Sequence, residues 1–204
     1  MAPRRKSVLP KTKTPDEWAK MFACIDTRYP TQVRNHALLM LLYATGLRVG
    51  EALALGTHDV DFGLGKLTVV DGKTGQRIVP LGHANAEMRP SLERWLRIRG
   101  EWNPESDLLF VTSTGGPLSA NAVRRTMLVY GERAGIGHIS PHMLRHSAAT
   151  EMLAAGAPPI GVQRCLGHRS LSTTLSVYAW AADTHAEDAM AARYAKGRAR
   201  GRGV

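Results

Sequence analysis

Two neighbouring runs of β-forming residues constrain the fold of this 204-residue chain more than any other feature of its sequence. Residues 66–70 and 76–81 are separated by residues 71–75, whose sequence DGKTG has the turn chemistry of a β-hairpin. The patterns on both sides of this hairpin are helical. The sequence therefore predicts a mainly α-helical α+β fold with one small antiparallel β-sheet, rather than a parallel α/β sheet.

Helix start and stop signals divide the rest of the chain. Thr14 precedes a proline and two acidic residues, as an N-cap does, and the apolar run 36–43 predicts a buried helix that reaches Gly46. Ser119 and Ser140 each precede a further helical pattern. The predicted helices cover approximately residues 15–25, 36–46, 90–99, 120–134, 141–155, 159–167 and 184–196.

The sequence SPHMLRH at residues 140–146 places two candidate phosphate ligands on one helix. With Ser140 as the N-cap and Pro141 in the first helical position, His142 and Arg145 lie about one turn apart on the same face. The start of a helix also presents unpaired N–H groups and the positive end of the helix dipole. Taken alone, the pattern fits either a phosphate site or a surface helix with two unrelated polar residues.

A second arginine follows the apolar helix that reaches Gly46. The sequence ATGLRVGE at residues 44–51 puts Arg48 at the end of a strongly apolar segment and Glu51 three residues later. Because an unpaired charge in an apolar setting is costly, Arg48 needs either an acidic partner or a bound anion.

Five short motifs together resemble the tyrosine recombinase (phage integrase, Xer-like) family. They are T-G-L-R-x-x-E, the hairpin G-K followed by R-x-V-P-L, S-P-H-x-L-R-H, L-G-H, and S-T-T followed by Tyr178. Each motif alone is weak, but the five occur in the family's order over residues 9–182, which makes the resemblance specific. The resemblance implies the catalytic-domain fold of that family. It also implies site-specific cleavage and rejoining of DNA through a 3′-phosphotyrosine, without metal, ATP or other cofactor.

The resemblance assigns the phosphate ligands residue by residue. Arg48 and Arg145 would hold the non-bridging oxygens of the scissile phosphate, where negative charge builds in the transition state. His168 would donate a further hydrogen bond to the same phosphate, and Glu51 would orient an arginine.

The resemblance also assigns the groups that move protons and form bonds. Tyr178 would be the nucleophile, and because a phenol has a pKa of about 10, the cationic cluster must favour its phenolate as it attacks. His142 would assist proton removal from the tyrosine or orient the phosphate, and Lys73 would protonate the departing 5′ oxygen. Arg124 and Arg125, on the helix after Ser119, are expected DNA contacts.

The net charge of +10 is confined to the two ends of the chain. Residues 1–13 and 189–204 each carry five Lys or Arg and no acid, which leaves 17 basic and 17 acidic residues between them. Such tails commonly neutralise nucleic-acid phosphates, although they also serve as solubilising ends. The resemblance names the partner as double-stranded DNA, on which the chain would form a homo-tetramer while remaining mainly monomeric when free.

We expect three segments along the chain: a basic N-terminal segment (1–13), the tyrosine recombinase catalytic domain (14–183), and a C-terminal helix with a basic tail (184–204). An apolar stripe on this last helix would pack either on its own core or on a neighbouring protomer. By this resemblance, the chain begins at the boundary where the family's N-terminal DNA-binding domain would end and its catalytic domain would start. An excised fragment, a single-domain protein and a remnant each fit this beginning.

Several classes of protein are disfavoured by the sequence. The longest apolar stretch is about half of a membrane span, and the N-terminus lacks the apolar core of a signal peptide. Cys24 and Cys165 stand outside any metal-ligand spacing, so we expect reduced thiols in a cytoplasmic protein with no membrane contact and no metal.

Two alternatives remain beside the recombinase. One is a non-catalytic DNA-binding remnant or accessory protein, against which the presence of all six expected catalytic residues argues. The other is a type IB topoisomerase-like relaxase, which the sequence does not separate from a recombinase because the two reactions share an active site.

Overall fold

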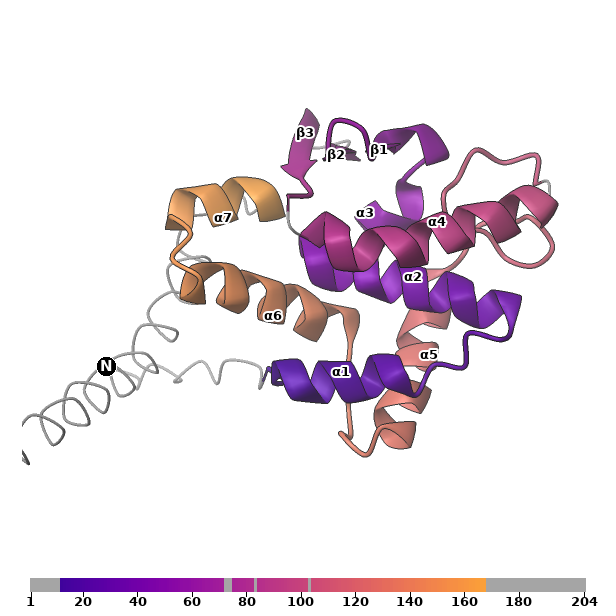
Figure 1. The fold of residues 1–204 in the computed structure, drawn as a ribbon, viewed down its shortest axis with the longest axis horizontal. Helices are drawn as coiled ribbons and strands as arrows, with labels where there is room; N and C mark the ends of the chain where they lie inside the picture. The colour runs from indigo at the N-terminus through magenta and orange to yellow at the C-terminus, as the bar shows by residue number, and fades with distance from the viewer. Residues whose placement is uncertain (1–11, 72–74, 83, 103, 168–204) are drawn as a thin grey trace, which may run out of the picture. The chain divides into compact units, whose positions relative to one another are not determined.

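The computed structural model describes residues 12–71, 75–82, 84–102 and 104–167 (Figure 1). The chain divides into two compact units, Met1–Ser147 and Ala148–Val204. In chain order the elements are α1 (Pro15–Ala23), α2 (Pro30–Thr45), α3 (Val49–Ala54), the 3-10 helix η1 (Thr57–Asp59), β1 (Val60–Asp61), β2 (Lys66–Asp71), β3 (Gly75–Pro80), α4 (Ala84–Trp102), α5 (Ala120–Arg133), α6 (Pro141–Ala154) and α7 (Pro159–Leu166).

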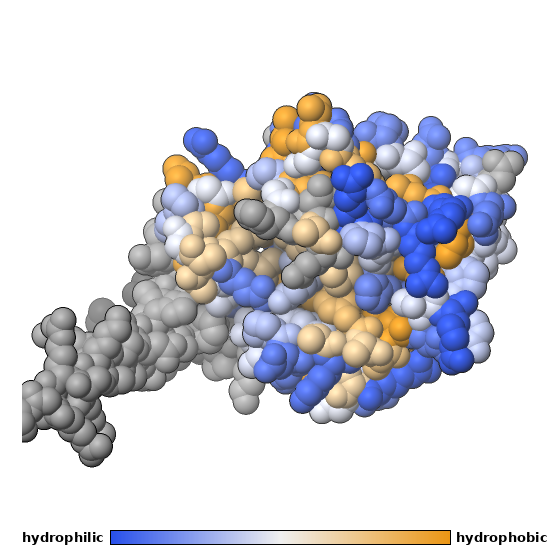
Figure 2. Space-filling view, in the orientation of Figure 1, coloured by the Kyte–Doolittle hydropathy of each residue, from blue (hydrophilic) through white to orange (hydrophobic). Residues whose placement is uncertain are grey.

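The first unit contains the sheet, whose order is β1-β2-β3 with both pairs antiparallel. Leu67 of β2 lies opposite Val79 of β3, and both are buried. The opposite face of the sheet exposes Val70 and Ile78. Figure 2 shows hydrophobic surface over the region where Figure 1 draws β2 and β3. The predicted mainly helical fold with a small antiparallel sheet is therefore confirmed.

Local signals in the sequence explain where the helices that build the site begin and end. Thr14 caps α1: its hydroxyl accepts a hydrogen bond from the Glu17 amide over 3.2 Å, and the Glu17 carboxylate accepts one from the Thr14 amide over 2.9 Å. Helix α2 ends at Gly46, whose φ of 64° is in the left-handed region that glycine adopts without strain. That turn places Arg48 directly at the start of α3.

The core of the first unit lies between α1, α2, α4, α5 and the inner face of the sheet. Its largest fully buried side chains include Trp18, Trp95, Tyr130, Phe110 and Met21. Helices α2 and α4 run side by side (Figure 1). Burial of this continuous apolar cluster provides the main stabilisation of the unit.

Two helices begin earlier than the sequence predicts, and the short elements α3, η1 and β1 were not among those predicted. Helix α2 begins at Pro30 rather than at residue 36, and α4 begins at Ala84, so that Pro90 lies inside it. Met88 is fully buried one turn before Leu92, so apolar burial extends α4 past the proline although Pro90 lacks an amide hydrogen. Strand β1 has only two residues, too few to show a period in the sequence.

The second unit is described over residues 148–167. Leu153 of α6 packs with Val162 and Leu166 of α7 in a small buried cluster. Helix α7 ends at Gly167, again with positive φ (67°), as predicted. The helix predicted over residues 184–196 lies outside the described residues.

Candidate active site

Three arginines from distant parts of the sequence, Arg48, Arg124 and Arg145, line one open pocket of about 320 Å³. Arg48 comes from the start of α3, and Arg145 comes from the second turn of α6. The pocket is also lined by Val49, Ser140, Pro141 and His142. The fold therefore brings together three of the predicted catalytic residues, Arg48, His142 and Arg145.

Arg145 is the buried arginine of this site. It is 5% exposed, and its Nη1 donates to the carbonyl oxygen of Gly46 over 2.7 Å. The pKa of Arg145 is lowered to about 10, mainly by burial and also by the positive charges of Arg48 and Arg77, while Glu51 opposes the shift. The guanidinium remains charged at neutral pH, in a place where a bound anion would stabilise it.

Glu51 accepts hydrogen bonds from two arginines. Arg48 donates from Nη1 to Oε1 over 2.9 Å, and its backbone amide donates to Oε2 over 2.8 Å. Arg77 of β3 donates to both oxygens, over 3.1 and 2.9 Å. Burial raises the pKa of Glu51, but the hydrogen bonds from Arg77 and Arg48 outweigh it and the pKa is lowered overall. The carboxylate is therefore ionised and accepts hydrogen bonds from both Arg48 and Arg77, while the orienting role expected of Glu51 stays a prediction.

Arg77 was not among the site residues predicted from the sequence. It lies opposite Val69 on the inner face of the hairpin, and its side chain is 15% exposed. The sequence signal that could have identified Arg77 is the alternation of side chains between the two faces of β3. This alternation puts Arg77 on the same face as the buried Val79. A charged residue at such a position requires an acidic partner, which is Glu51.

The remaining predicted residues fall into two groups. His142 is exposed and lines the pocket, one turn before Arg145 on α6. Arg124 and Arg125 are both exposed on α5, but only Arg124 lines the pocket. Lys73, His168 and Tyr178 lie outside the described residues.

The described side chains and helix lengths meet the requirements of neither a metal site of three or more ligands nor a membrane span. Among the residues that the structure describes, no group of three or more His, Cys, Asp or Glu could hold a metal ion. Within the same part of the chain, no helix has the length and apolar character that crossing a membrane requires.

Comparison with known proteins agrees with this arrangement. The model of the phage integrase family matches residues 11–185. The tyrosine recombinase XerC of Actinobacillus succinogenes is 36% identical over 176 residues, and that of Haemophilus influenzae (strain PittEE) is 33% identical over 174 residues. Each alignment covers 85% of this chain and 58% of the relative, so the chain spans little more than half the length of these proteins.

Solved structures show the same fold. The crystal structure of XerA recombinase superposes with a TM-score of 0.74 at 30% identity, covering 83% of this chain and 60% of that one. The XerH site-specific recombinase bound to its palindromic difH substrate gives a TM-score of 0.77 at 28% identity, covering 89% and 53%. With the family model matching most of its length and the family's arginine motifs meeting in one pocket, this chain belongs to the phage integrase family of tyrosine recombinases.

Proposed function

We propose that this chain is the catalytic domain, residues 14–183, of a site-specific DNA recombinase. The observation that carries the proposal is the convergence of Arg48, His142 and Arg145 on one open pocket, with Arg145 buried and Arg48 fixed by Glu51. Guanidinium groups bind the paired oxygens of a phosphate through parallel N–H donors, and they stabilise charge that develops there. The DNA complex of XerH, a protein of the same fold, supports a DNA phosphate as the ligand.

The proposed reaction is a phosphoryl transfer that is reversible. The Tyr178 oxygen attacks the scissile phosphorus, the bond from phosphorus to the 5′ oxygen breaks, and a 3′-phosphotyrosine forms. The phenol loses its proton with help from His142, and Lys73 supplies a proton to the departing 5′ oxygen. Attack of a 5′ hydroxyl on the phosphotyrosine reverses these steps, so rejoining requires no ATP.

The arginines and His168 would supply the positive charge that the transition state needs, so we expect activity in EDTA. We further propose that the chain is mainly monomeric when free and assembles as a tetramer on DNA.

Covalent capture of DNA tests this function. A pool of nicked duplexes of random sequence, which lose the short fragment after cleavage and cannot be rejoined, is incubated with the chain in EDTA. We expect a denaturant-resistant DNA adduct, and the captured DNA then defines a substrate for rate measurements. Binding without any adduct would contradict the proposal and favour a non-catalytic DNA-binding module. Relaxation of supercoiled DNA without strand exchange between duplexes would favour the relaxase.

Arg124 and Arg125 provide a matched pair of variants for the pocket. Both are exposed arginines on α5, but only Arg124 lines the pocket. Arg124→Ala should slow adduct formation at saturating protein, whereas Arg125→Ala should affect only binding and its salt dependence. Equal effects of the two changes on the saturated rate would contradict a role for the pocket in catalysis.

A further inference from the structure

A buried hydrogen bond joins α1 to the helix that carries the phosphate ligands. The indole Nε1 of Trp18 donates to Oγ of Ser147 over 2.8 Å. Both residues are buried, with 0% and 2% of their surface exposed. The Ser147 hydroxyl lies 3.5 Å from the carbonyl oxygen of Lys13, to which it donates. Ser147 therefore ties α6 to the segment through which the chain enters α1.

Ser147 and Arg145 hold α6 from opposite sides. The two residues are two positions apart, so their side chains leave the helix about 200° apart. Arg145 contacts the Gly46 carbonyl at the end of α2, while Ser147 contacts Trp18 on α1. The first two turns of α6 are thus fixed between α1 and the end of α2.

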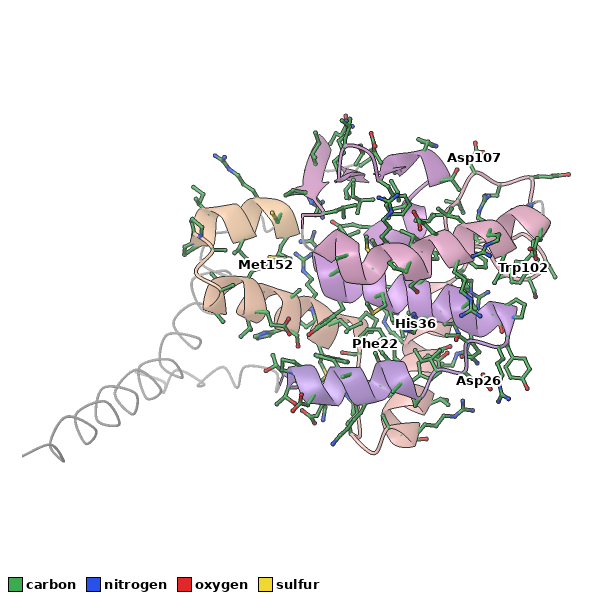
Figure 3. The ribbon with its side chains drawn as sticks, viewed as in Figure 1. Phe22, Asp26, His36, Trp102, Asp107 and Met152 are labelled. Carbon is green, nitrogen blue, oxygen red and sulfur yellow. The ribbon has the colours of Figure 1, made fainter. Side chains whose placement is uncertain are left out.

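Helix α1 is itself fixed on α2 by aromatic contacts. The rings of Trp18 and Tyr43 have centroids 6.2 Å apart. The rings of Phe22 and His36, which are labelled in Figure 3, meet edge to face with centroids 5.5 Å apart. The contacts form a closed circuit that runs from α6 to α1, from α1 to α2, and from α2 back to α6 through Arg145. A rotation of α6 about its axis would break at least one of these contacts.

Lys13 extends the same support to the segment before α6. Its ammonium group donates to the carbonyl oxygen of Ile136 and pairs with Glu17 over 3.1 Å. Ile136 lies five residues before the first residue of α6. Residues 13–18 therefore hold both α6 and the segment that leads into it.

We propose that Trp18 and Ser147 are positioning residues for DNA strand cleavage, which fix Arg145 and His142 relative to Arg48 through α6. This inference rests on the proposed function. Neither residue lines the pocket, so both act through the helix and not on the substrate. Small displacements of a transition-state ligand are sufficient to slow a reaction strongly, because the ligand must match the charge as it develops.

Single-turnover capture of the nicked duplex tests the inference. Trp18→Phe and Ser147→Ala should each lower the saturated rate of adduct formation by about 10- to 100-fold, and change the half-saturating concentration by less than about threefold. The double variant should be no slower than the slower single variant, because both changes remove the same bond.

Trp95→Phe is the matched control. Trp95 is also fully buried, and its Nε1 also donates over 2.8 Å, but to the Leu109 carbonyl. The Trp95→Phe variant should lose thermal stability, as Trp18→Phe does, but it should keep the wild-type cleavage rate. If Trp18→Phe cleaves at the wild-type rate, or if Trp95→Phe is equally slow, the positioning role is wrong while the proposed function stands. A wild-type chain that captures no DNA would overturn the proposed function and this inference together.

Discussion

At the scale of residues, the site concentrates positive charge around one carboxylate. Glu51 interacts with Arg48, Arg77 and Arg145, so three positive charges and one negative charge leave these four side chains with a net charge of two. Arg77 donates to both oxygens of Glu51, one of which also accepts from the Arg48 guanidinium. One carboxylate is thus shared by two arginines, and the cluster keeps an excess of positive charge. Such a preorganised excess of charge suits a phosphate that gains negative charge in its transition state.

The geometry of Arg48, and not only its charge, should matter. Arg48→Lys keeps the charge but removes the planar fork, so cleavage should fall by about 10²- to 10³-fold. Its side chain is 45% exposed, so stability should change by less than about 1 kcal/mol. Capture rates and thermal melts check both outcomes, with Arg125→Lys as the control. Cleavage within a few-fold of wild type would contradict the role of Arg48.

Removal of the Glu51 charge should destabilise the fold in a pH-dependent way. Glu51→Gln leaves Arg77 without its buried carboxylate partner, at a cost of about 3 kcal/mol near neutral pH. The pKa of Glu51 is lowered from its ordinary value of 4.5, so its stabilisation is fully present above that pH and is lost as the pH falls through the lower folded value.

Urea unfolding at several pH values tests this dependence. The difference in the free energy of unfolding between wild type and Glu51→Gln should shrink below about pH 4.5. Glu93→Gln breaks an exposed pair with Arg89 and should cost under about 1 kcal/mol. A difference for Glu51→Gln that is small or constant with pH would show that the carboxylate contributes little.

At the scale of elements, helix ends were predictable because single residues determine them. Two helix starts are capped by side chains, those of Thr14 and Ser119. Two helix ends are set by glycines in the left-handed region, Gly46 and Gly167. The starts of α2 and α4 were not predicted. Helix α2 begins at a local signal that the sequence prediction did not use, Pro30 in the first helical position, whereas burial of Met88 extends α4 past Pro90.

The candidate site was predictable only in part. Arg48, His142 and Arg145 were found through motifs, and the fold places them in one pocket. Predicting that Arg77 belongs to the site would have required knowing which face of β3 is buried and that Glu51 of α3 packs against it. The bond between Trp18 and Ser147 joins residues 129 positions apart, a pairing that no local pattern encodes.

The approach of α5 to the segment before α6 depends on Gly131. A Cβ atom at this position would lie 2.1 Å from the carbonyl oxygen of Gly137, which is backbone and has little room to move. Gly131→Ala should destabilise the protein by roughly 1–3 kcal/mol. Gly100→Ala, in an open position of α4, should instead stabilise it by up to about 1 kcal/mol. Thermal unfolding distinguishes the two, and an unchanged melting temperature for Gly131→Ala would contradict the close approach.

At the scale of the whole molecule, catalysis and non-specific affinity are assigned to different parts of the sequence. The excess of positive charge lies in residues 1–13 and 189–204, while the chain between them carries equal numbers of basic and acidic residues. The arginine pocket is built entirely from this formally neutral portion. We therefore expect the ends to govern how strongly the chain binds DNA and the pocket to govern how fast it cleaves.

Deletion of residues 197–204 tests this division. The segment contains three arginines, so its loss should reduce the slope of log affinity against log salt by up to about 3. The cleavage rate at saturating protein should not change. Replacement of Arg198, Arg200 and Arg202 by glutamine should reproduce the deletion if charge alone is responsible. An unchanged slope would show that the tail does not contact DNA.

Identification of the residue that carries the DNA adduct tests the central claim most directly. The captured complex is digested with protease and nuclease, and the modified peptide is sequenced by mass spectrometry. The variants Tyr178→Phe and Tyr194→Phe are tested in parallel, because Tyr194 is the next tyrosine along the chain. We predict a nucleotide on Tyr178, no adduct with Tyr178→Phe despite DNA binding within a few-fold of wild type, and normal adduct formation with Tyr194→Phe. An adduct that persists in Tyr178→Phe, or that maps to Tyr194, would contradict the assignment of the nucleophile.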